Sequence, residues 1–221
     1  MSRTFFAGLL CLVIAHAAAA QSADPVEPSG TRLLVGPTGR ALEQGQFYVD
    51  FSGFVGGPFV HVGITDRISL GAGTPVLIPG IRPGDAMVVT PKVQVYSSAK
   101  VAASVGVLQF AGSKVTPGGI AYAVVTRGSF DGAITGGVGF SYSSLRKAEG
   151  ARKPLVLLGG EKRISPRFKL ITENYAGLGG GLVSGGLRFM RGHGTLDLGV
   201  ATLVGADHLL VAPIFRFAWS L

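Results

Sequence analysis

FDGAITGGVGFSYS, residues 130–143, alternates large and small side chains with a period of two. Phe130, Ile134, Val138 and Phe140 share one face, and the residues between them are small or polar. Fourteen residues of this alternation are more than most strands of soluble proteins contain. The pattern is typical of a strand that crosses a membrane in a closed barrel, with one face in lipid and the other in the lumen.

The end of the chain, residues 208–221, carries the same alternation. Four large apolar residues of this stretch share one face, and Arg216 lies on the other. Outer-membrane barrels commonly end in such a strand, with aromatic residues that the barrel-assembly machinery recognises. We predict that these residues face the membrane and form an assembly signal, although the last one is not aromatic: Phe215, Phe217, Trp219 and Leu221.

The composition agrees with a membrane barrel. Charged residues make up 14% of the 221 residues, against about 25% in soluble domains. After residue 20 no run of 18 apolar residues occurs, so helical membrane crossing is excluded. A soluble barrel with its apolar face inside is the alternative, but it would need a more highly charged exterior.

Three regions are expected. Residues 1–20 resemble a secretory signal peptide, with Arg3 before an apolar core and an alanine-rich end. A membrane anchor is the alternative, but the apolar run is too short. The only cysteine, Cys11, would leave with the signal. We predict a periplasmic lead-in over residues 21–45 and an outer-membrane barrel over residues 46–221.

Residues 46–221 predict an all-β fold, an antiparallel transmembrane barrel of about twelve strands, with ten as the alternative count. Longer links at 75–85, 111–117 and 143–152 alternate with tight turns, the asymmetry expected between external loops and periplasmic turns. The expected strands are 46–54, 58–65, 67–74, 86–97, 100–110, 118–127, 129–142, 153–164, 167–175, 178–190, 194–204 and 208–221.

Charged residues set the orientation of each strand. In the alternating segments they lie opposite the bulky apolar residues, and a basic side chain on the lipid face at the membrane midplane costs roughly 2–4 kcal/mol. We therefore predict that the following residues face the lumen: Asp50, Lys92, Asp131, Lys169, Glu173, Arg188, Asp197 and Arg216.

Several motifs resemble those of small uncharacterised bacterial outer-membrane β-barrel proteins. They are GPTGRAL at residues 36–42, VGITDRISLG at residues 62–71, GEKRISPR at residues 160–167 and GLRF at residues 186–189. The resemblance covers most of the mature chain and implies a barrel. It implies no activity.

No catalytic, cofactor-binding or metal-binding residues are predicted, and we expect no enzyme. A barrel lipid esterase needs His and Ser two positions apart, and the nearest match is His193 with Thr195. The formal net charge of +8 does not indicate nucleic-acid binding, because no basic stripe with interleaved aromatics accompanies it. Basic residues near 146–153 would instead pair with lipopolysaccharide phosphates. The expected partners are lipid, lipopolysaccharide and the assembly machinery, around a monomer in the bacterial outer membrane.

The sequence favours two functions. The first is a narrow passive channel for small polar or anionic solutes, since a barrel of about twelve strands has a wider lumen than one of eight. The second is a closed structural or adhesion barrel that binds partners through the loops at 75–85 and 143–152. An embedded lipid-modifying enzyme is the least favoured hypothesis.

Overall fold

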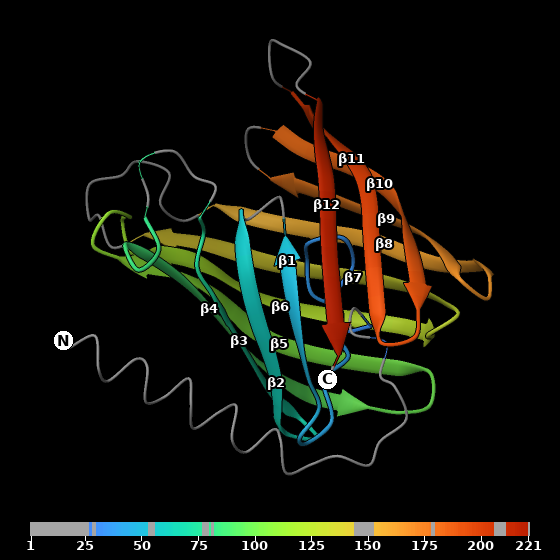
Figure 1. Cartoon of the computed structure of the whole chain (residues 1–221). Coiled ribbons are helices and arrows are strands. Elements are labelled where there is room, and N and C mark those ends of the chain that lie inside the picture. Colours follow the sequence, from blue (N-terminus) through green and yellow to red (C-terminus); the bar gives the residue numbers. More distant parts are fainter. Residues whose placement is uncertain are drawn as a thin grey trace.

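The computed structural model describes residues 27, 30–52, 56–76, 80, 82–143, 153–177, 180–205 and 211–220. Within them, twelve antiparallel strands form one closed barrel (Figure 1). Each strand pairs with its neighbours in sequence, and β12 pairs with β1 to complete the ring. Closure leaves no unpaired sheet edge, as a barrel in lipid requires.

The strands follow the ranges expected from the sequence, so the predicted fold class is confirmed. Their bounds are β1 Phe47–Ser52, β2 Gly57–Thr65, β3 Ile68–Gly73, β4 Ala86–Ser97, β5 Val101–Gly112, β6 Gly118–Ser129, β7 Gly132–Ser143, β8 Pro154–Ser165, β9 Phe168–Gly177, β10 Gly180–Arg191, β11 Gly194–Val204 and β12 Val211–Ser220.

The two ends of the barrel differ in their connections. Two residues separate β2 from β3, β6 from β7, β8 from β9 and β10 from β11 at one end. At the other end, the separation ranges from two residues between β9 and β10 to twelve between β3 and β4. The start of β1 and the end of β12 lie at the end with the tight turns, where Tyr48 pairs with Ser220. We call this the turn end, and the opposite one the loop end.

The outer wall is apolar and the inner wall is mixed. On β7, Ile134, Val138 and Phe140 are more than half exposed, whereas Ala133 and Thr135 are buried. The outward residues expose apolar surface in a band where lipid would cover it. Among the described residues, no helix is long and apolar enough to span a membrane.

Two local features explain departures from simple alternation. A bulge between Gln94 and Tyr96 in β4 turns Tyr96 outward, although the sequence pattern placed it on the face of Lys92. Pro213 lies third in β12, and among the described residues it pairs only with β11. In the described part of the barrel, the missing N–H of this proline therefore interrupts no ladder on the β1 side.

Residues 30–42 of the expected lead-in lie inside the barrel, which corrects the periplasmic placement of these residues. Residues 1–26, 28 and 29, which include the expected signal peptide, lie outside the described residues. Residues 30–42, here called the inner segment, run within the ring of strands in Figure 1. Leu33, Leu34, Thr38 and Leu42 are at most 2% exposed. The segment folds back on itself, because Leu33 N–H donates to Gly36 and Thr38 N–H donates to Thr31.

The charged inner wall accounts for this placement. Backbone carbonyls and amides of the inner segment add hydrogen bonds to inward-facing side chains whose capacity the wall alone does not fill, such as Glu173, Ser104 and Arg188. A lead-in left in the periplasm would provide none of these partners.

Candidate functional site

Seven of the eight residues expected in the lumen are buried in the barrel interior, each at most 7% exposed. They are Asp50, Lys92, Lys169, Glu173, Arg188, Asp197 and Arg216. Strands on opposite parts of the barrel contribute them, and they form hydrogen bonds with one another or with the inner segment.

Asp131 is the exception, and its expected lumen position is corrected. It lies in the tight turn between β6 and β7, and its side chain is 73% exposed. Its Oδ1 accepts from Arg163 Nε at 2.5 Å. The alternation extends to Asp131 in sequence, but β7 begins only at Gly132, so the parity of the strand does not apply to the turn.

The aromatic residues near the end of the chain face outward. Phe215, Phe217 and Trp219 are 40–47% exposed on β12, and the rings of Phe217 and Trp219 lie 6.3 Å apart. Leu221 lies outside the described residues. Recognition of these residues by assembly machinery remains a prediction.

The first ion cluster joins β10, β11 and β12. Arg188 Nε donates to Asp197 Oδ1 at 2.7 Å, and Arg216 Nη2 donates to Asp197 Oδ2 at 2.7 Å. Both arginines also donate to the carbonyl of Leu33, at 2.9 and 3.0 Å. One carboxylate thus holds two guanidinium groups against the bend of the inner segment.

A second cluster lies nearer the turn end. Lys169 Nζ donates to Glu27 at 2.6 Å and lies 3.5 Å from Glu161 Oε2. Glu161 also accepts from Arg40, whose guanidinium lies 4.5 Å from the centroid of the Phe130 ring. These contacts join Glu27, which precedes the inner segment, and Arg40, near its end, to the wall.

Glu173 holds the bend in the middle of the barrel. Its carboxylate accepts from Val35 N–H at 2.9 Å, from Gly36 N–H at 2.8 Å and from the Tyr175 hydroxyl at 2.5 Å. A charged acceptor with three donors is well compensated for its burial.

Arg32 links the inner segment to β1 and β2. Its guanidinium lies 3.4 Å from Asp50, and the same carboxylate oxygen lies 3.1 Å from His61. Burial alone would lower the pKa of Arg32, but the negative charge of Asp50, with smaller contributions from Tyr48 and Glu173, raises it overall. Arg32 therefore carries a positive charge inside the barrel.

The backbone of Gly39 lies close to the wall. Its N–H donates to Thr126 at 2.8 Å, and its carbonyl accepts from Gln94 and Ser104 at 3.1 and 2.7 Å. A Cβ at this position would collide with the carbonyl of Ala102. Only glycine lets the backbone lie this close to the wall.

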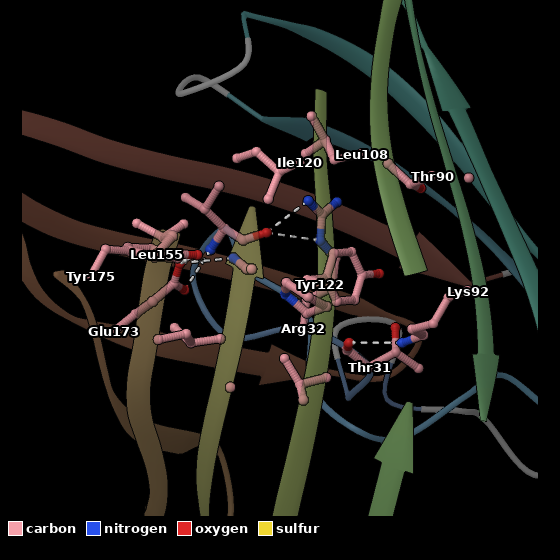
Figure 2. A pocket seen from close by; sticks show the side chains of 18 of the residues that line it. Thr31, Arg32, Thr90, Lys92, Leu108, Ile120, Tyr122, Leu155, Glu173 and Tyr175 are labelled. Atoms are coloured by element: carbon pink, nitrogen blue, oxygen red, sulfur yellow. Dashed lines mark hydrogen bonds between the residues drawn. The ribbon is translucent and has the colours of Figure 1, made fainter. Parts of the chain in front are cut away.

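A cavity of about 370 Å³ lies between the bend of the inner segment and the loop end. Apolar side chains from the loop-end halves of β5, β6, β8 and β10 form much of its wall, namely Leu108, Phe110, Ile120, Leu155, Leu157 and Leu182. Figure 2 shows Arg32 in the middle of this cavity beside Tyr122, with Glu173 and Lys92 on opposite sides.

The inner segment and the apolar cavity are not evident from the sequence. The motif at residues 36–42 resembles those of barrel proteins but carries no sign that it lies in the lumen. In Leu155–Leu158 both faces are apolar, so alternation gives no sign that Leu155 and Leu157 face inward.

Chemically, the interior can hold a peptide segment and an anion. Among the described residues, no group of three His, Cys, Asp or Glu side chains could hold a metal. His193 lies in a tight turn, within 3.5 Å of the Ser220 hydroxyl, and Thr195 is buried.

Solved porins share this fold. The KdgM porin matches at a TM-score of 0.53 and 7% identity, over 79% of this chain and 96% of the porin. The KdgM porin in complex with disordered oligogalacturonate gives 0.54 at the same identity and coverage. The NanC porin in a rhombohedral crystal form gives 0.51 at 10% identity, over 80% of this chain and 98% of the porin. No protein-family model and no curated protein matches the chain.

Proposed function

We propose that the protein is an outer-membrane channel for small solutes, closed in its resting state by its own inner segment. The observation that carries this proposal is a twelve-stranded porin-like barrel whose charged inner wall binds residues 30–42. An eight-stranded barrel would be filled by its own side chains, whereas twelve strands leave room that here a segment of chain occupies.

The contacts of the inner segment favour a closure that can be released. Beside the apolar packing of Leu33 and Leu34 on the wall, they include hydrogen bonds and ion pairs, such as those of Glu173 and Arg188. Water or a solute can replace such polar partners. The strands of the barrel pair with one another independently of the segment. Displacing the segment would therefore widen the lumen without opening the wall.

Conductance of single molecules in planar bilayers tests the channel. We compare the mature chain with a deletion of residues 27–40, which keeps β1 and the packing of Leu42 on Tyr48. The deletion should give steps several-fold larger than those of the wild type. Folding is verified by migration on a gel before and after heating.

A second variant covers the case in which the deletion does not fold. Replacing residues 27–40 with a Gly/Ser segment of equal length keeps the chain connection but removes Arg32, Arg40 and Glu27. Its conductance should also exceed that of the wild type. If either variant folds and conducts no more than a protein-free bilayer, the channel proposal is refuted.

The alternative is a closed barrel with a structural or adhesive role, which the occupied interior also favours. Its binding loops would be residues 75–85 and 143–152, of which 77–79, 81 and 144–152 lie outside the described residues. A folded deletion variant without conductance would favour this role over the channel.

A further inference from the structure

The walls of the cavity differ from those expected for a path for polar solutes. Leu108 and Phe110 from β5, Ile120 from β6 and Leu155 from β8 all line it. Lipid covers outward-facing apolar residues, but it does not reach inward-facing ones that line a water-filled route. Their burial becomes favourable only when an apolar body displaces water from the cavity.

The floor of the cavity carries positive charge. Arg32 and Lys92 both line it. Lys92 Nζ donates to the carbonyls of Arg40 and Thr31, at 2.5 and 3.3 Å, and no carboxylate lies within 4.0 Å of it among the described residues. An ammonium group has three donors, so Lys92 keeps one for a further acceptor.

The acidic group on the same floor is already satisfied. Glu173 accepts from two backbone amides and from Tyr175. Asp50, beside Arg32, is bonded to His61 as well. Lys92 is thus the charged group on the floor with a donor left for an incoming molecule. Arg32 beside it already bonds Asp50 and the Val35 carbonyl, and the group that complements these two cations is an anion.

We propose that this cavity binds an amphipathic monocarboxylate, with its carboxylate at Lys92 and Arg32 and its alkyl or aryl body against the apolar walls. The inference rests on the proposed function in taking this molecule as the solute that the channel admits. A volume of about 370 Å³ is at the lower end of the range for small-molecule sites, which suits a compact body and excludes a polymer.

The same geometry disfavours a sugar acid. Each hydroxyl of a sugar needs a hydrogen-bond partner when it is buried, and Leu108, Phe110, Ile120 and Leu155 offer none. Selectivity for an apolar body over a hydroxylated one therefore follows from the walls, and selectivity for an anion follows from the floor.

Calorimetric titration of the folded protein in lipid nanodiscs tests the site, because detergent chains would compete for the cavity. The probes are octanoate, its uncharged analogue octanamide, and galacturonate, with empty nanodiscs to subtract partition into lipid. Octanoate should bind one to one and roughly tenfold or more tighter than octanamide. Galacturonate should give no measurable binding.

Lys92→Met separates the carboxylate contact from the apolar one. This variant should weaken octanoate about tenfold or more and leave octanamide within about twofold. Lys169→Met is the matched control, because Lys169 also bonds near the inner segment, through Glu27, but does not line the cavity. It should leave octanoate binding unchanged.

Leu108→Asp adds a negative charge to the wall and should abolish binding of octanoate. The proposal is overturned if octanoate does not bind, if galacturonate binds as tightly, or if Lys92→Met and Lys169→Met weaken octanoate equally. Octanoate binding to a barrel whose deletion variant does not conduct would retain the site and refute only the channel. Conductance without octanoate binding would retain the channel and refute only the site.

Discussion

Replacing Asp197 with Asn tests whether the barrel interior is closed to water. Asp197 is fully buried and accepts from Arg188 and Arg216, with two bonds from each. The amide keeps the size of the carboxylate but leaves Arg188 with Glu27 as its ion-pair partner and Arg216 with no carboxylate within 4.0 Å among the described residues. Removing one partner of a buried ion pair typically costs about 3–5 kcal/mol.

The free energy of unfolding in lipid vesicles measures this cost. Trp219, the only tryptophan in the chain, reports on unfolding by its fluorescence in a urea titration. Asp197→Asn should lower the free energy of unfolding by about 3–5 kcal/mol. Asp131→Asn is the matched control, because it removes an aspartate whose side chain is 73% exposed, and it should cost less than about 1 kcal/mol.

The reasoning would be refuted if Asp197→Asn and Asp131→Asn unfolded at the same urea concentration. That result would mean that water reaches the Arg188 and Arg216 guanidinium groups in the folded barrel and screens them.

Two further predictions concern the wall and the inner segment. Leu158→Arg, on the outer face near the middle of β8, should destabilise the barrel in lipid vesicles by about 2–4 kcal/mol. Ile164→Arg, near the turn end of the same strand, should cost about 0–1 kcal/mol. Equal costs would contradict the position of the membrane around the middle of the barrel. Glu173→Gln should weaken the hold on the bend and speed hydrogen exchange at Val35 and Gly36 severalfold, measured by mass spectrometry, and unchanged exchange would show that Glu173 does not fix the bend.

The sequence predicts the barrel well because the cost of a charge in lipid is large and local. This cost alone places Lys92, Arg188 and Arg216 on the inward face of their strands, whatever the rest of the chain does. Where strand parity ends, prediction fails: Asp131 lies in a turn, and the bulge in β4 turns Tyr96 outward.

The inner segment could not be predicted in this way, since its position depends on contacts between residues far apart in sequence. Leu33 meets Arg216 across 183 positions, and Gly39 meets Thr126 across 87. Nothing in residues 30–42 alternates, so periodicity gives no signal there. The charged residues predicted in the lumen do indicate a further segment there, because buried charges require partners and the barrel wall alone supplies only some of them.

Labelling of a single thiol tests most directly whether the inner segment closes the lumen. Thr38→Cys, in a chain expressed from residue 21 so that it lacks Cys11, places a thiol at a fully buried position of the segment. Gln44→Cys places one at an exposed position next to it. In proteoliposomes permeable to the maleimide reagent from both sides, Gln44→Cys should react at once and Thr38→Cys only after unfolding. Equal rates of labelling in the folded protein would contradict the account.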